Sequence, residues 1–147
     1  MDATLGHYNP AMLLAGDVGG TKTLLGLFEP AAPRPLAGIT RSYPTASFTS
    51  FTRMLEAFIA DVGATTITAA ALGVAGPVVA QRAVVTNIGW AVDAAEVTAH
   101  LGATGTRILN DLEAMATSVD VLDESELVTL QEGTPDPSGN EIGRAHV

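Results

Sequence analysis

Two short apolar runs meet at a glycine turn near the start of the chain, in the stretch LLAGDVGGTKTLLGLFE, Leu13 to Glu29. Gly19 and Gly20 fall in the middle of this pattern, where they would weaken a helix. Two strands joined by a tight turn fit the pattern better. The stretch therefore predicts an antiparallel β-hairpin at the start of the folded core.

Beyond the hairpin, strand patterns and helix patterns alternate. The predicted strands cover residues 36–44, 66–76, 81–87 and 106–110, and the predicted helices cover residues 48–62, 94–101 and 111–119. The resulting order is βββαββαβα. This order is typical of an α/β domain in which helices cover a mixed sheet.

The predicted helices carry recognisable start and stop signals. In the first helix, apolar residues recur at helical spacing, namely Phe48, Phe51, Leu55, Phe58, Ile59 and Val62. Ser47 or Thr49 is its candidate N-cap, and Gly63 is its candidate stop.

The second and third helices have shorter patterns. Asp93 and Glu96 form a predicted capping box at the start of the second helix, and Gly102 ends it. One face of the third helix carries the apolar residues Leu112, Met115, Ala116 and Val119.

Composition excludes several function classes. The 147 residues include sixteen acidic and seven basic side chains, and the formal net charge is -9. No run of lysine or arginine could follow a phosphate backbone, so we expect no nucleic-acid partner. An anionic ligand would have to be held by backbone N–H groups, a metal ion or helix ends.

Cysteine is absent, which excludes disulfides and thiolate metal sites and suits a reducing compartment. His100 has no second ligand at metal-binding spacing, and we expect it to be a surface side chain. The first sixteen residues carry no basic segment and only a short apolar one, so neither a signal peptide nor a membrane span is expected. These features predict a cytoplasmic protein.

The two ends of the chain differ from its middle. Residues 1–11 show no apolar periodicity and are predicted to be a flexible leader. Residues 141–147, EIGRAHV, resemble the in-frame translation of a sequencing-library adapter and are interpreted as a non-native tail. Residues 12–140 are then the predicted domain.

Three motifs could carry chemistry: GDVGGTKT at 16–23, TNIGW at 86–90 and LNDLEA at 109–114. Each also has an ordinary interpretation, as a hairpin turn that needs positive φ, a turn-forming asparagine and a helix cap respectively. A simple hairpin, however, does not need Asp17 at the end of an apolar strand, which points to a cation. The glycines that follow allow a phosphate to approach, and the hydroxyls of Thr21 and Thr23 could add donors.

The first motif resembles the first phosphate motif of the superfamily of sugar kinases, heat-shock ATPases and actin. The stretches TNIGWAVD and RILNDLEAMA are similar to bacterial glucokinases in particular. The resemblance covers residues 12–137 and implies a ribonuclease H-like mixed sheet. It also implies that the chain is the amino-terminal domain of a two-domain sugar kinase, which would be inactive without the rest.

The resemblance assigns roles to individual residues. It implies that ATP contacts six consecutive residues, Gly16, Asp17, Val18, Gly19, Gly20 and Thr21. It implies that Asp17 holds Mg²⁺ through water. Asn87 and Asn110 would bind the sugar. Asp111 would also contact the sugar and act as the general base for its 6-hydroxyl, which suits phosphoryl transfer because that reaction needs positioning and one carboxylate near the nucleophile.

Several alternatives stay open. Lys22 stands where some glucokinases have Asn and where relatives in the repressor-kinase group often have Lys, so a sugar-responsive regulator or another sugar kinase of that group is the alternative function. An acidic interaction module is a third hypothesis. The expected partners are glucose and ATP. The oligomeric state of the parent protein stays open, with a homodimer as one alternative.

Overall fold

The structure is a computed structural model that describes residues 11–63, 65–85, 87–129 and 133. The predicted tail, 141–147, and all but the last residue of the predicted leader lie outside the described residues. The elements, in chain order, are β1 (Ala11–Val18), β2 (Lys22–Glu29), β3 (Leu36–Pro44), a 3₁₀ turn (Thr45–Ser47), α1 (Phe51–Val62), β4 (Thr66–Val74), β5 (Val78–Val79), β6 (Arg82–Val84), β7 (Ala91–Asp93), α2 (Ala94–Leu101), β8 (Gly105–Asn110), α3 (Asp111–Ser118) and two further 3₁₀ turns (Val119–Val121 and Glu124–Glu126).

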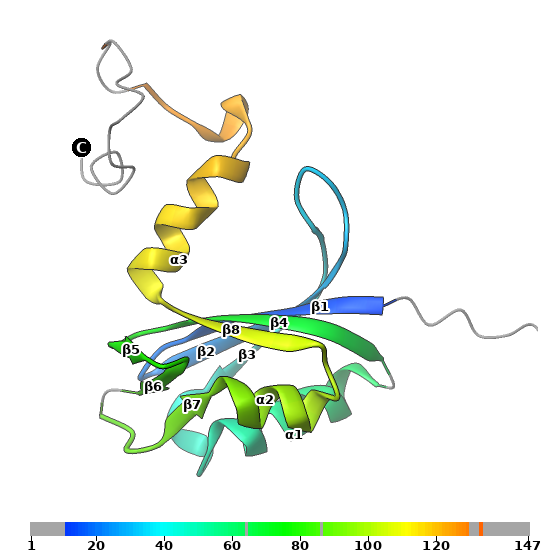
Figure 1. Cartoon of the computed structure of the whole chain (residues 1–147), viewed down its shortest axis with the longest axis vertical. Coiled ribbons are helices and arrows are strands. Elements are labelled where there is room, and N and C mark those ends of the chain that lie inside the picture. The colour runs from blue at the N-terminus through cyan, green and yellow to red at the C-terminus, as the bar shows by residue number, and fades with distance from the viewer. Residues whose placement is uncertain (1–10, 64, 86, 130–132, 134–147) are drawn as a thin grey trace, which may run out of the picture.

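The main sheet has five strands in the order β3-β2-β1-β4-β8. Strands β1, β2 and β3 pair antiparallel, whereas β4 runs parallel to both β1 and β8. Helices α1 and α2 cover one face, and α3 rises from the other (Figure 1). The predicted α/β class with a mixed sheet is therefore confirmed.

The core lies between the sheet and the helices α1 and α2. Its largest fully buried side chains come from β1, β2, β4, β8, α1 and the segment around β7, and they are Leu14, Val18, Leu25, Phe51, Met54, Leu55, Phe58, Leu72, Val74, Val85, Val92 and Ile108. Alternation along β1 explains this, because even-numbered residues face the helices and odd-numbered residues face the opposite side. Asp17 therefore lies on the face from which α3 rises.

A second, three-stranded sheet, β5-β6-β7, was only partly predicted. The pattern over residues 81–87 indicates β6, but β5 and β7 have two and three residues, too few to show a period. The Gln81 side chain links this sheet to the main one, because its Oε1 accepts a hydrogen bond of 2.8 Å from the backbone N–H of Ile108 in β8.

Gly63 ends α1 as predicted, only the Asp93 half of the predicted Asp93–Glu96 capping box forms within the described residues, and the predicted N-cap of α1 is wrong. Asp93 caps α2 by accepting from two backbone N–H groups, and Gly102 ends it in the left-handed conformation. The N-cap of α1 is Ser50, whose Oγ accepts from the N–H of Arg53, and not Ser47 or Thr49. Ser47 instead ends a 3₁₀ turn and the next residue is extended, so α1 cannot begin there.

Helix α3 forms where the pattern predicts it, but its apolar face is not buried. Leu112 and Met115 are 60% and 58% exposed, and no residue of α3 counts as buried. The helix touches the sheet mainly through its first turn and then leaves it (Figure 1). No helix in the described part of the chain is long and apolar enough to cross a membrane.

A tyrosine–aspartate pair joins β3 to α1 and gives a pH-dependent prediction. The Tyr43 hydroxyl donates to Asp61 Oδ2 at 2.6 Å. Burial, this hydrogen bond and the negative charge of Asp61 raise the pKa of Tyr43 to about 12 from 10.0. The folded state favours the neutral phenol, so this contribution to stability is complete below pH 10 and is lost as the pH rises towards 12.

We expect Asp61→Asn to lower the pKa of Tyr43 towards 10, because the charge that opposes phenolate formation is removed. Titration by ultraviolet absorbance, with Tyr43→Phe subtracted and circular dichroism confirming the fold at each pH, measures the shift. Glu56→Gln is the matched control, since Glu56 lies on the same helix but pairs with Arg53. An unchanged Tyr43 titration in Asp61→Asn would contradict the assignment.

Candidate active site

The candidate active site lies where three parallel strands end. In the ladder, Asp17 of β1 pairs with Gly73 of β4, and Gly73 pairs with Leu109 of β8. Paired residues of parallel strands point to the same face, so Asp17 and Leu109 share the face from which α3 rises. Two strand spacings separate their backbones, about 10 Å. Asp111 follows Leu109 by two residues and starts α3.

Gly73 is the floor between the two acidic positions. A Cβ built on it would lie 3.3 Å from the Cβ of Ala114, 3.8 Å from the carbonyl oxygen of Gly16 and 3.9 Å from the Cα of Asp111. The Gly16 carbonyl and the start of α3 thus approach the same point from two sides. A side chain larger than hydrogen at Gly73 would crowd the first turn of α3.

The turn between β1 and β2 consists of Gly19, Gly20 and Thr21. The N–H of Gly19 donates to the Lys22 carbonyl at 3.1 Å, and a Cβ on Gly19 would lie 2.9 Å from that oxygen. Close approach, rather than positive φ, therefore explains glycine at this position. In the described part of the chain, no hydrogen bond uses the N–H groups of Gly20 and Thr21. Adjacent free N–H groups at a turn can bind an anion.

Asp17 is exposed beside this turn, and within the described ranges its carboxylate has neither a hydrogen-bond nor an ion-pair partner. The described residues hold no cluster of three or more histidines or acidic side chains that could bind a metal. A single free carboxylate nevertheless fits Mg²⁺, which keeps several waters and is bound mostly through substrate phosphates.

Asn110 and Asp111 form the cap of α3. Asn110 Oδ1 accepts from the N–H of Leu112 at 3.0 Å, and its Nδ2 donates to the Gly76 carbonyl at 2.9 Å. One N–H and one lone pair of the Asn110 amide remain for a ligand. Asp111 Oδ1 accepts from the same N–H at 2.9 Å, which leaves its Oδ2 without a hydrogen bond within the described ranges.

Asn87 lies in the loop between β6 and β7, with φ of 68°, and is exposed. Trp90, in the same loop, donates from Nε1 to the Phe48 carbonyl at 3.2 Å and packs against Phe51 with ring centroids 6.4 Å apart. The indole therefore anchors this loop to the start of α1. Within the described residues, no hydrogen bond joins Asn87 to the cap of α3.

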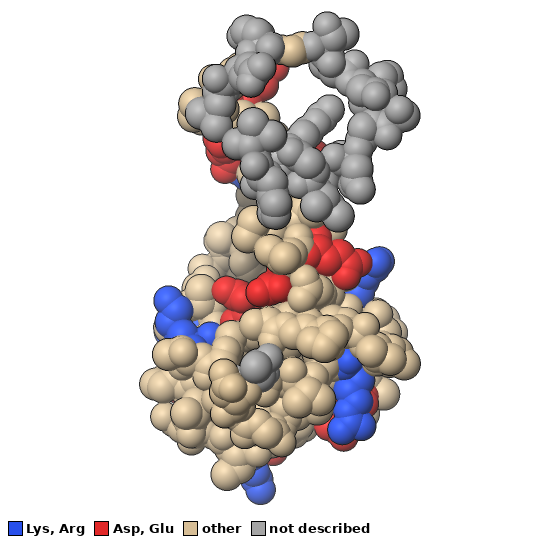
Figure 2. Space-filling model, turned by 90° about the vertical axis from the view of Figure 1, so that its left-hand side faces the viewer, with Lys and Arg blue, Asp and Glu red and all other residues tan. Residues whose placement is uncertain are grey.

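Acidic side chains gather at the narrow part of the molecule, where α3 leaves the body, as Figure 2 shows from the side on which the three strands end. Basic side chains in the same view lie mainly around the rim of the body. A polyphosphate at the turn between β1 and β2 would meet backbone N–H groups, the Asp17 carboxylate and the exposed Lys22, which follows the turn at the start of β2. A divalent cation would offset the repulsion between the phosphates and the carboxylates.

Comparison with known proteins identifies the family of the chain. A family model described as glucokinase matches residues 14–142. The chain belongs to the glucokinase family. The glucokinases of Nostoc punctiforme and Chromohalobacter salexigens are 33% and 34% identical over 127 and 124 residues, or 86% and 84% of this chain.

A crystal structure of glucokinase from an Antarctic psychrotroph superposes with a TM-score of 0.76 at 25% identity, over 86% of this chain. The matched regions are only 37%, 38% and 40% of the Nostoc, Chromohalobacter and Antarctic proteins. The chain therefore spans less than half the length of the glucokinase relatives that it matches.

The structure brings together most of the residues that the glucokinase resemblance selected. Asp17, the 19–21 turn and the Asn110–Asp111 cap share one edge of the sheet, and their individual roles remain predictions. Val18 is fully buried, so only its backbone is available to a ligand. Thr23 is also fully buried, and its expected role as a ligand donor is wrong because its hydroxyl faces the core.

Two groups of the site in this glucokinase-family domain are not indicated by any sequence motif. Gly73 provides room between β1 and α3, and the Gly76 carbonyl holds the Asn110 amide. The pattern ALGVAG contains both glycines, but it indicates only a strand running into a turn. Which strand and which helix meet there depends on the sheet order.

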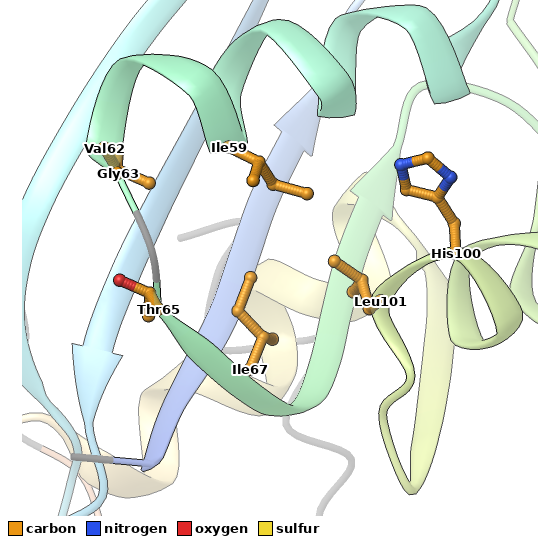
Figure 3. Close-up of a pocket in the computed structure, with 7 residues that line it drawn as sticks. All are labelled: Ile59, Val62, Gly63, Thr65, Ile67, His100 and Leu101. Atoms are coloured by element: carbon orange, nitrogen blue, oxygen red, sulfur yellow. The ribbon is translucent and has the colours of Figure 1, made fainter. Parts of the chain in front are cut away.

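Two cavities of the described residues differ in their distance from the site. A cavity of about 210 Å³, shown in Figure 3, is lined by the end of α1, the start of β4 and the end of α2, including Ile67 and an exposed His100. Ile67 and Gly73 are six residues apart on β4, about 20 Å, so this cavity is remote from the site. A groove of about 320 Å³ instead includes Asp17, Ala15 and Gly26 and continues the site across β1 and β2.

Proposed function

We propose that the intact protein transfers the γ-phosphoryl group of ATP to the 6-hydroxyl of glucose, in the cytoplasm, where ATP is available. The observation that carries this proposal is the shared sheet edge of Asp17 and Asp111, with Gly73 as the floor between them. Membership of the glucokinase family supports the same reaction. The proposed roles are divided between the end of β1 and the end of β8.

The β1 end provides the nucleotide side of the proposed site. Its free N–H groups at Gly20 and Thr21 would receive phosphate oxygens. Gly16 would contact the nucleotide only through its backbone, because a Cβ on it would meet the core side chains of Leu72 and Leu25 at 2.7 and 2.8 Å. Asp17 would hold Mg²⁺ through water. The ion, when bound, neutralises charge on the phosphates.

The β8 end provides the sugar side. Asn110 would donate to and accept from sugar hydroxyls with the capacity that its two structural bonds leave, and Asn87 would contact the sugar from its loop. Asp111 would accept the 6-hydroxyl proton on its free Oδ2. The sugar oxygen then forms a bond to the γ-phosphorus, the bond from that phosphorus to the β,γ-bridging oxygen breaks, and ADP leaves with that electron pair.

Replacement of the base tests this assignment. We expect Asp111→Asn in the intact protein to lower kcat by about 10²- to 10⁴-fold, because a positioned general base contributes that much. Glucose binding should persist, since the amide keeps the size and the Oδ1 acceptor of the side chain. A coupled assay for ADP and calorimetric titration with glucose provide the two measurements.

Glu113→Gln is the matched control, because Glu113 lies in the first turn of the same helix and is exposed. It should leave kcat within about twofold of the parent value. Turnover retained in Asp111→Asn would rule out this base. Glucose binding without turnover in the unmodified intact protein would instead favour the sugar-responsive regulator.

The 147-residue chain by itself should not phosphorylate glucose. It spans less than half of its glucokinase relatives, and a kinase site needs groups on both sides of a closing cleft to exclude water. The same coupled assay on the purified chain checks this. Glucose-dependent ADP production by the chain alone would contradict the expectation.

A further inference from the structure

Two buried hydroxyls lie directly beneath the turn between β1 and β2. Thr23 and Thr45 are the buried polar side chains of the described chain, each with 0% exposure. Thr23 follows the turn in β2, and Thr45 begins the 3₁₀ turn after β3. A hydroxyl in such a place is costly unless it is hydrogen-bonded, so its partners should indicate why it is there.

Three hydrogen bonds connect Thr45 to the turn or to Thr23. Its backbone N–H donates to the Thr21 carbonyl at 3.0 Å, and its Oγ1 donates to the Gly19 carbonyl at 2.8 Å. Its Oγ1 is also 2.9 Å from Thr23 Oγ1. The one hydroxyl proton of Thr45 is used on Gly19, because a carbonyl can only accept, so Thr23 must be the donor between the two hydroxyls.

These bonds decide which way the turn presents its N–H groups. In a trans peptide the C=O and the following N–H point in opposite directions. Thr45 draws the Gly19 carbonyl towards the core, which turns the Gly20 N–H outwards. Without the Thr45 hydroxyl, the Gly19 carbonyl would lose its buried partner, and the Gly19–Gly20 peptide would be free to rotate.

We propose that Thr45 is a positioning residue for the phosphoryl donor: its hydroxyl, supported by Thr23, orients the Gly20 N–H towards the phosphates. This inference rests on the proposed function, because it assumes that the turn binds a nucleotide. Thr45 itself is buried and touches no ligand. Its effect should therefore appear in nucleotide affinity and not in sugar affinity.

The chain offers a matched control for the loss of a threonine pair. Thr98 Oγ1 donates to Thr106 Oγ1 at 2.9 Å, between α2 and β8, and this pair is partly buried. Thr98→Val and Thr45→Val each remove one hydroxyl from a threonine–threonine contact at nearly constant shape. Only the second removal affects the turn between β1 and β2.

The first test is kinetic and uses the intact protein. We expect Thr45→Val to raise KM for ATP about tenfold, the effect of losing one well-placed hydrogen bond, with KM for glucose unchanged. Thr45→Ser should restore the parent KM for ATP, and Thr98→Val should not change it. Equal rises in both KM values, or no rise for ATP, would overturn the proposal.

The second test does not require activity. ¹⁵N relaxation of the 147-residue chain should show lower order at the Gly20 and Thr21 amides in Thr45→Val, and parent-like order in Thr45→Ser and Thr98→Val. Thr23→Val, which keeps the bond from Thr45 to Gly19, should give an intermediate result and replaces Thr45→Val if that variant does not fold. Unchanged order at both amides would overturn the proposal. If the unmodified intact protein does not phosphorylate glucose, that result counts only against the proposed kinase function.

Discussion

The parallel register of β1, β4 and β8 is the constraint on which the site depends. It brings the carboxyl ends of three strands to one edge of the sheet. Gly73, 56 positions after Asp17, pairs with it in the ladder, and Leu109, 92 positions after Asp17, pairs with Gly73 on the other side. The helices α1 and α2 hold this register by covering one face with apolar side chains. A shift of one residue in β4 would turn Gly73 to the other face and close the site.

Much of the fold could be predicted because its signals are local. The glycine turn predicts the hairpin, helical spacing predicts α1, and Asp93 with Gly102 delimits α2. The signals fail where a structural choice depends on distant residues. The position of the α1 N-cap at Ser50 depends on the 3₁₀ turn before it, and the unburied face of α3 depends on what packs there, which a periodic pattern does not encode.

The candidate site divides in the same way. The sequence motifs indicate Asp17, the 19–21 turn and the Asn110–Asp111 cap, because these are polar groups at the ends of apolar strands. They could not show Gly73 or Thr45, whose contacts cross between strands that are far apart in the chain. Thr23 illustrates the limit most clearly, because alternation along β2 turns its hydroxyl away from the ligand and towards Thr45.

The central claim is that the ends of β1 and β8 form one site, so that the nucleotide phosphates held at β1 lie next to the cap of α3, and paramagnetic broadening by Mn²⁺–ATP tests it most directly. With the ¹⁵N-labelled chain, the claim predicts broadening of amides in the 19–21 turn and also in Asn110–Leu112, with Mg²⁺–ATP as the diamagnetic reference. Asp17→Asn should weaken both sets together. Broadening confined to one strand end, or to the acidic segment 123–126, would contradict the claim.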